Sequence, residues 1–139
     1  MRIMAIDYGD AHTGIAISDP TGFLAGFTTT IDAYRPEVVA DRVAALAREH
    51  GVEELVLGHP INMDGTRGPR SEKAQAMKAL LEEVTSLPVV LWDERRTTID
   101  AHQILFNSGK NAKKRKKVVD AVAASLILEG YLTYKKNHL

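Results

Sequence analysis

The stretch "RIMAIDYGDAHTGIAIS", from Arg2 to Ser18, decides how the chain begins to fold. A short apolar run ends at Asp7, and a second apolar run begins at Gly14 after a polar turn. Gly9 and Gly14 allow the backbone to turn tightly beside the carboxylate of Asp7. We therefore predict a β-hairpin whose first strand delivers Asp7 at its carboxyl end. A lone acid there is often only a turn residue, so a site needs acids from elsewhere in the chain.

Beyond the hairpin, strands and helices alternate. The predicted elements are a strand over 23–30, a helix over 36–50 closed by Gly51, a strand over 55–58, a helix capped by Ser71, a strand over 88–92, a short helix capped by Thr97 or Thr98, and a last helix over roughly 116–134. This order predicts an α/β fold with a five-stranded mixed sheet and helices on both faces. Ligands are expected at the carboxyl ends of its parallel strands.

The composition is that of an ordinary globular protein. The 139 residues, 45% apolar and 26% charged, fit one domain, predicted to span residues 1–139. The absence of cysteine excludes a disulfide framework and a thiolate metal site. No apolar stretch approaches the roughly 20 residues that a membrane span needs. The first apolar run is interrupted at once by Asp7, unlike a signal peptide. We expect a cytoplasmic protein with no membrane partner.

The charges balance over the whole chain but not along it. With 18 basic and 18 acidic residues, the molecule as a whole does not attract nucleic acid. One basic run stands out and contains Lys110, Lys113, Lys114, Arg115, Lys116 and Lys117. Such a run can pair with phosphates and release counterions, although a solvated helix start or a flexible loop is an equally good explanation of it.

A second acidic block, "DERRTT" from Asp93 to Thr98, follows the apolar run of the predicted fifth strand. Its acids are expected at the same edge of the sheet as Asp7. Glu94 is the predicted site residue in preference to Asp93, and the end of the strand decides between the two. A polar turn without further function is the alternative interpretation of this block.

Asp120 is the third acid, in the stretch "KKVVDAVAASLIL" of the predicted last helix. Ala123, Ala124 and Ile127 follow it at helical spacings i+3, i+4 and i+7, so Asp120 is predicted on the inward, apolar face. A carboxylate buried without a partner is costly. The alanines allow the helix to come close to the sheet, which would bring Asp120 toward Asp7.

Three converging carboxylates predict a cation. Two carboxylates about 5 Å apart repel by roughly 3 kcal/mol at an effective dielectric constant near 20. Oxygen ligands alone suit Mg²⁺ or Mn²⁺, and two such ions can activate a water and stabilise the leaving oxygen of a phosphodiester. The basic residues predicted to hold nucleic acid are Arg67, Arg95, Arg96, Lys113, Lys114, Lys116 and Lys117. The alternative is that these are surface charges.

Four blocks together resemble a known family. They are "DYGDAHTGIAISD" (7–19), "GHPINMDGTRG" (58–68), "DERRTT" (93–98) and "KKVVDAVAASLIL" (116–128). In this order they resemble the signature blocks of the YqgF family, the RuvX-type, Holliday-junction-resolvase-like proteins of the ribonuclease H-like superfamily. The four blocks are distributed over almost the whole chain, and the set is more specific than any one of them.

The resemblance implies a ribonuclease H-like fold and a cytoplasmic bacterial nuclease that processes the 5′ end of precursor small-subunit ribosomal RNA. Junction resolution in DNA is the related possibility. By position, the acidic site falls on Asp7, Glu94 and Asp120. The expected partners are structured RNA, branched DNA and ribosomal precursor particles, and a monomer and a homodimer are equally compatible with the sequence.

Two other functions are compatible with parts of the sequence. The turn between the first two strands also resembles the phosphate loop of actin-like sugar kinases, but those enzymes enclose a nucleotide between two related domains, and 139 residues supply one. A non-catalytic ribosome-assembly or RNA-binding protein could keep the same fold. Trp92 is predicted to pack beneath the site, and His59 to have a structural or surface role.

Overall fold

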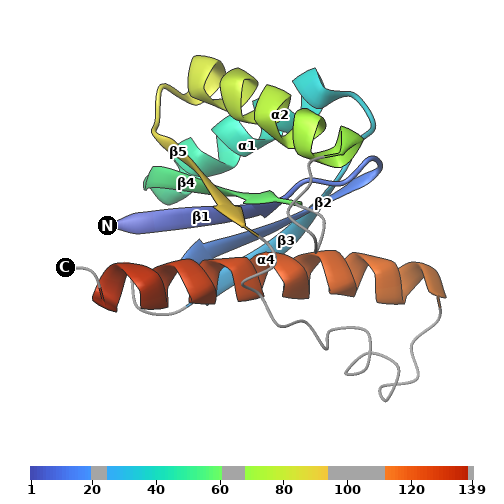
Figure 1. Cartoon of the computed structure of the whole chain (residues 1–139). Helices are drawn as coiled ribbons and strands as arrows, with labels where there is room; N and C mark the ends of the chain where they lie inside the picture. The colour runs from blue at the N-terminus through green and yellow to red at the C-terminus, as the bar shows by residue number, and fades with distance from the viewer. Residues whose placement is uncertain (20–24, 61–67, 94–111, 138–139) are drawn as a thin grey trace.

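The strands of the computed structural model form one five-stranded sheet (Figure 1). The structure describes residues 1–19, 25–60, 68–93 and 112–137, with the side chains of the last segment described from Ala121 onward. Its elements are β1 (Arg2–Asp7), β2 (His12–Ser18), β3 (Ala25–Asp32), α1 (Pro36–His50), β4 (Val52–His59), α2 (Pro69–Thr85), β5 (Val89–Asp93) and α4 (Ala112–Asn137).

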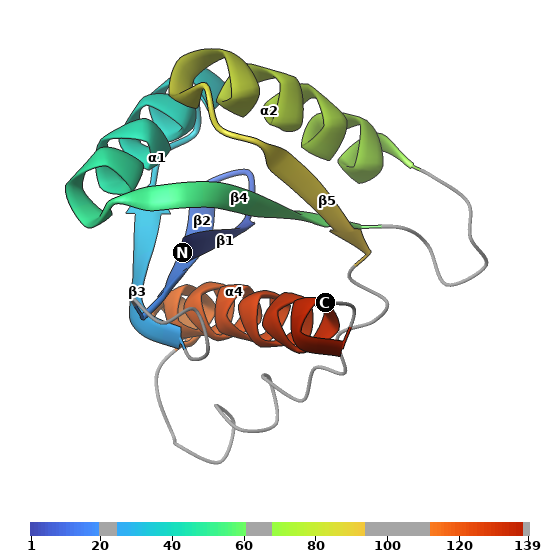
Figure 2. The ribbon, with the colours of Figure 1, turned by 90° about the vertical axis from the view of Figure 1, so that its left-hand side faces the viewer.

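The strand order is β3-β2-β1-β4-β5, so β1 lies at the centre of the sheet. β2 pairs antiparallel with both β1 and β3, whereas β1, β4 and β5 run parallel to one another. Helices α1 and α2 cover one face of the sheet and α4 covers the other (Figure 2). The predicted mixed sheet with helices on both faces is confirmed. The predicted short helix after β5 lies outside the described residues.

Alternation along β1 sorts its side chains between the two faces. Met4 and Ile6 belong to the core cluster beneath α1 and α2. Ile3 and Ala5 belong to a second cluster, together with Ala124 and other residues of α4. Asp7 therefore lies on the α4 face of the sheet, at the end of its central strand.

The ends of α1 agree with the sequence-based prediction, whereas the start of α2 differs from it. Helix α1 begins at Pro36 and is closed by Gly51, whose φ of 66° is left-handed. Helix α2 begins at Pro69, so the prediction that Ser71 caps it is wrong. Proline has no N–H and a fixed φ that suits the first helical position, and the N-cap is therefore Gly68, three residues earlier than expected.

Candidate functional site at the carboxyl ends of the parallel strands

Three parallel strands end at one edge of the sheet. Ile6 of β1 is in register with Leu57 of β4, and His59 at the end of β4 is in register with Asp93 at the end of β5. Asp7 and Asp93 therefore lie at the same edge, on strands that flank β4. This is the edge at which open α/β sheets bind ligands.

The two acids lie on opposite faces of the sheet. In β5, Val90 and Trp92 contact the cluster on the α4 face, and Leu91 packs on the other side. Alternation then places Asp93 on the face of α1 and α2, away from the face of Asp7. Asp93 and Asp7 thus lie at the same edge but on opposite faces of the sheet.

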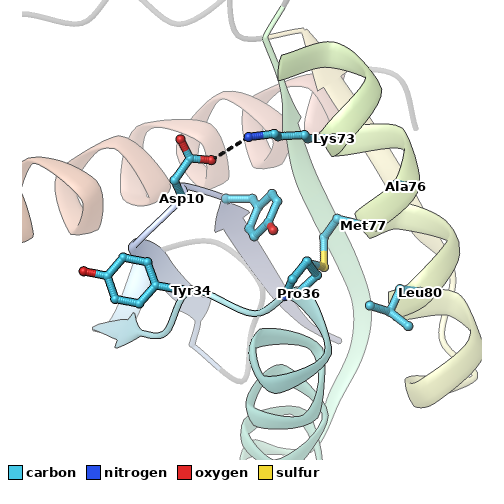
Figure 3. Close-up of a pocket in the computed structure, with 8 residues that line it drawn as sticks. Asp10, Tyr34, Pro36, Lys73, Ala76, Met77 and Leu80 are labelled. Carbon is cyan, nitrogen blue, oxygen red and sulfur yellow. Dashed lines mark hydrogen bonds and ion pairs between the residues drawn. The ribbon is translucent and has the colours of Figure 1, made fainter. Parts of the chain in front are cut away.

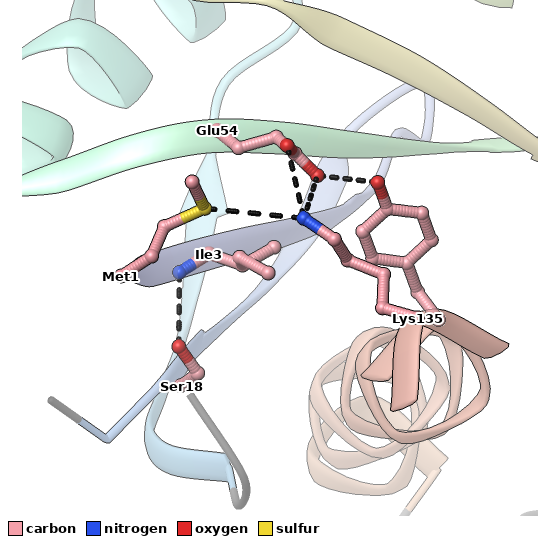
Figure 4. A network of polar contacts seen from close by, with 6 residues as sticks. Met1, Ile3, Ser18, Glu54 and Lys135 are labelled. Atoms are coloured by element: carbon pink, nitrogen blue, oxygen red, sulfur yellow. Dashed lines mark hydrogen bonds and ion pairs between the residues drawn. The ribbon is translucent and has the colours of Figure 1, made fainter. Parts of the chain in front are cut away.

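Helix α4 runs antiparallel to β1 (Figure 1). Its last turns reach the amino end of β4, where the Tyr131 hydroxyl donates to Glu54 Oε1 and Lys135 Nζ lies 3.3 Å from Glu54 Oε2 (Figure 4). Ala124 packs in the same cluster as Ala5. Because Asp120 precedes Ala124 by one helical turn, its backbone lies toward the carboxyl end of β1, where Asp7 stands. The side chain of Asp120 is outside the described residues.

The turn that follows Asp7 requires a glycine. A Cβ atom added to Gly9 would collide with the carbonyl oxygen of His12, which is a backbone atom. The chain between β1 and β2 therefore folds back on itself directly beside Asp7. Only a residue without a side chain allows this close approach without moving the turn.

A groove of about 130 Å³ begins at Asp7, and Arg70 and Lys73 of α2 line its other side. Lys73 Nζ lies 3.0 Å from Asp10 Oδ1, and both side chains are more than half exposed. Tyr8 also lines the groove, and burial, assisted by the charge of Asp10 and opposed by that of Lys73, raises the pKa of its hydroxyl. Tyr8 therefore keeps its proton at neutral pH and can donate a hydrogen bond.

Sequence reasoning did not assign Lys73 to the site. Lys73 and Asp10 are 63 residues apart, and neither lies in a motif that pairs them. The available signal was that α2 is the element that follows β4 in the chain, which brings the first turns of α2 to the ligand-binding edge. The groove thus combines a carboxylate on the central strand with two cations from the next crossover helix.

The structure describes the side chains of only some of the predicted site residues. Asp7 lies in the groove. Glu94, Arg95, Arg96 and Arg67 are outside the described residues, and the helical positions Lys113, Lys114, Lys116, Lys117 and Asp120 have no described side chains. Among the side chains that are described, no three His, Asp or Glu residues gather as they would around a metal ion.

His59 and Trp92 are structural. His59 is 6% exposed, and its Nε2 is hydrogen-bonded to Ser71 Oγ at 2.6 Å, which ties the end of β4 to the first turn of α2. Trp92 is 7% exposed and packs edge-on against Tyr131 and Tyr134, with ring centroids 5.8 Å apart in each pair. The burial predicted for Trp92 is confirmed, and its ring contacts are with the last turns of α4. Within the described part of the chain, no helix has the length and apolarity needed to cross a bilayer.

The sheet order, the antiparallel start and the parallel strands that follow define a ribonuclease H-like α/β protein. The same fold is found in T. thermophilus RuvC in complex with a Holliday junction substrate, with a TM-score of 0.64, 14% identity and coverage of 97% of this chain and 96% of that one. At this identity the likeness concerns the fold alone.

Sequence comparison identifies the family. The family model RuvX, described as Holliday junction resolvase, matches residues 1–134, and the chain belongs to this family. A relative from Halothermothrix orenii named "Putative pre-16S rRNA nuclease" is 44% identical over 135 residues, which are 97% of this chain and 96% of the relative. A relative of the same name from Listeria monocytogenes is 46% identical over 134 residues, covering 95% and 97% of the two chains.

Proposed function

We propose that this protein is a metal-dependent nuclease that hydrolyses phosphodiester bonds and processes the 5′ end of pre-16S ribosomal RNA. The observation that carries the proposal is Asp7, which ends the central strand in a groove also lined by Arg70 and Lys73. Family membership and the name shared by relatives of nearly equal length support the same activity. We treat residues 1–139 as one domain acting in the cytoplasm.

The proposed catalytic acids are Asp7, Glu94 and Asp120. Asp93 lies on the face of α1 and α2, opposite to Asp7, which argues against Asp93 as the partner of Asp7. If the alternation of β5 continues by one residue, Glu94 is on the same face as Asp7, which favours Glu94. The position of Asp120, one turn before the buried Ala124, favours its approach to Asp7 on the α4 face of the sheet.

The donor chemistry fits Mg²⁺ or Mn²⁺, because Asp7 offers carboxylate oxygens and the chain has no cysteine. When bound, such an ion would supply activation of a water and stabilisation of the leaving oxygen. Asp7, Glu94 and Asp120 would hold it.

The cations have a separate task. Arg70 and Lys73 would pair with phosphates that enter the groove. The basic positions predicted from the sequence, Arg67, Arg95, Arg96, Lys113, Lys114, Lys116 and Lys117, would extend this contact along structured RNA or a ribosomal precursor particle.

Two alternatives remain open to test. The family description, Holliday junction resolvase, favours branched DNA as a second candidate substrate. A non-catalytic ribosome-assembly factor would bind RNA through the same cations without cutting it. One cleavage experiment distinguishes both alternatives from an rRNA nuclease.

The experiment measures cleavage of end-labelled precursor ribosomal RNA and of a four-way DNA junction by wild type and by Asp7→Asn. Each reaction contains Mg²⁺, Mn²⁺ or a chelator. We expect metal-dependent cleavage of the RNA that falls by about 100-fold or more in the variant, since a lost metal ligand costs several kcal/mol in the transition state. Asp41→Asn, which changes an exposed acid of α1, is the matched control and should cleave normally. RNA bound but left intact in every metal would establish the assembly factor instead.

The choice between neighbouring acids is tested in the same assay. Glu94→Gln should reduce cleavage as strongly as Asp7→Asn, whereas Asp93→Asn should retain most of it. The opposite result would mean that the strand alternation does not continue to position 94.

A further inference from the structure

A second pocket adjoins the groove on the face of α1 and α2 (Figure 3). Its volume is about 520 Å³, which lies within the range of roughly 300–1,000 Å³ typical of small-molecule sites. Tyr8 and Tyr34 contribute aromatic rings to its wall, and Pro36, Met77 and Leu80 contribute apolar surface. The Lys73–Asp10 ion pair lies beside these residues.

This lining suits a flat aromatic ring. Nucleobases stack on aromatic side chains with little dependence on sequence, because every base has a π face. Tyr34 is 80% exposed, so its ring is accessible to an incoming ligand. The apolar floor formed by Met77 and Leu80 offers few hydrogen-bonding groups, and a base would be held there by stacking and burial rather than by its edge.

The pocket and the groove are continuous. Tyr8, Asp10 and Lys73 line both of them. Tyr8 directly follows Asp7 in the chain. The side chain of Tyr8 contacts the core beneath α1 and α2, whereas Asp7 lies on the α4 face. A nucleic-acid strand whose phosphate lies in the groove can therefore place a neighbouring base in the pocket.

We propose that the pocket lined by Tyr8, Tyr34, Pro36, Met77 and Leu80 is a nucleobase subsite that takes one unpaired base of the substrate strand. Lys73, at the border of pocket and groove, contacts a phosphate of the same strand. The inference rests on the proposed nuclease function and specifies its substrate: the strand bound beside Asp7 must be single-stranded there, because only an unstacked base can enter the pocket.

The ion pair at the border is part of the subsite. Lys73 and Asp10 lie 3.0 Å apart with side chains 58% and 71% exposed, and exposed pairs of this kind are weak. An incoming phosphate can replace Asp10 as the partner of Lys73. Asp10 thus competes with the substrate for the cation, and removing its charge should strengthen binding.

The subsite is tested by binding in a chelator, so that no cleavage occurs. The probe is a short single-stranded oligoribonucleotide carrying 2-aminopurine, compared with the same strand containing one abasic position. Tyr34→Ala should weaken binding of the intact strand by about fivefold or more, and Tyr34→Phe should restore it. Phe27→Ala, which removes a partly exposed aromatic side chain of β3, is the matched control and should bind normally. Equal binding by wild type and Tyr34→Ala, or of intact and abasic strands, would overturn the subsite.

The ion pair is tested with the same probe at several salt concentrations. Asp10→Asn should bind more tightly than wild type. Lys73→Ala should bind more weakly and reduce the salt slope by about one unit. If Asp10→Asn binds more weakly, Asp10 supports the substrate rather than competing with it, and this part of the proposal is wrong.

Failure of the subsite and failure of the nuclease are distinguishable. A protein that cleaves RNA with unchanged binding in Tyr34→Ala lacks the subsite but is still a nuclease. A protein whose binding depends on Tyr34 and on the base, but which cleaves nothing in any metal, has the subsite and is not a nuclease.

Discussion

The two ends of the parallel strands are built differently. At the amino end, polar groups satisfy one another: Glu54 is held by Tyr131 and Lys135 of α4, and the N–H of Ile3 donates to Ser18 Oγ at 2.9 Å (Figure 4). The contacts of Glu54 fasten the last turns of α4 to the sheet, and the bond between Ile3 and Ser18 joins β1 to β2.

At the carboxyl end, charged groups border a groove, and the ion pair between Lys73 and Asp10 is exposed. Asp7, Arg70 and Lys73 surround a groove, and Tyr34 stands at an adjoining pocket with most of its surface exposed (Figure 3). The comparison indicates that one end of the sheet maintains the fold and the other is available to a ligand. Substitutions at the amino end should therefore lower stability alone, whereas substitutions at the carboxyl end should also lower activity.

The largest effect is expected from Gly9→Ala, because the new Cβ would collide with the His12 carbonyl oxygen. The turn beside Asp7 must then shift, which should lower the free energy of unfolding by about 1–3 kcal/mol and reduce RNA cleavage more than tenfold. Denaturant unfolding and the cleavage assay measure the two effects.

Gly26→Ala in β3 is the matched control. Its Cβ would meet Asp19 at 3.5 Å, an ordinary contact, so stability should be unchanged or slightly higher. A Gly9→Ala variant as stable and active as Gly26→Ala would mean that the turn can relax without moving Asp7.

A similar loss of stability but a smaller effect on cleavage is expected from the two buried serines, one at each end of the sheet. Ser18→Ala leaves the Ile3 N–H without its acceptor, and Ser71→Ala removes the hydroxyl bonded to His59. Each should cost about 1–3 kcal/mol of stability. Only Ser71→Ala should also change cleavage, because it loosens the joint between β4 and α2 that positions Lys73. Equal loss of cleavage in both variants would contradict the assignment of the site to the carboxyl end of the parallel strands.

The smallest effect is expected from Tyr131→Phe, roughly 1 kcal/mol, because Lys135 still accompanies Glu54. Burial and the hydrogen bond to Glu54 raise the pKa of Tyr131 above its ordinary value of 10.0. The folded state therefore holds this proton more tightly than the unfolded state. The stabilisation is complete below pH 10 and declines as the pH rises past that value.

The measurement is the difference in unfolding free energy between wild type and Tyr131→Phe from pH 7 to 11, with Lys135 present in both. The difference should narrow above pH 10, and cleavage at neutral pH should be equal in the two proteins. A difference that grows with pH would contradict the sign of the pKa shift.

The fold was predictable because its signals are local. Apolar alternation marked the strands, helical spacing marked α1 and α2, and Gly51 marked the end of α1. Ser71 misled because a capping residue and a buried first-turn residue look alike in sequence. Its true partner, His59, lies 12 residues away in the chain.

The candidate site was only partly predictable. Asp7 could be placed at the end of the first strand from the apolar run before it, and the structure puts it in a groove. Glu94 and Asp120 stay predictions. Lys73 and the pocket beside Tyr34 could not be anticipated, because they depend on how α2 and the start of α1 pack over the end of the sheet.

The sequence by itself determined which segments become strands and helices, that an acid ends the first strand, and which family the chain resembles. Periodicity and turn chemistry act between neighbours in the chain, so they can be read without coordinates. Only the tertiary structure decided that Asp7 and Asp93 lie on opposite faces and that Lys73 meets Asp10. Those relations depend on strand register and helix packing, which are set by contacts between residues far apart in the chain.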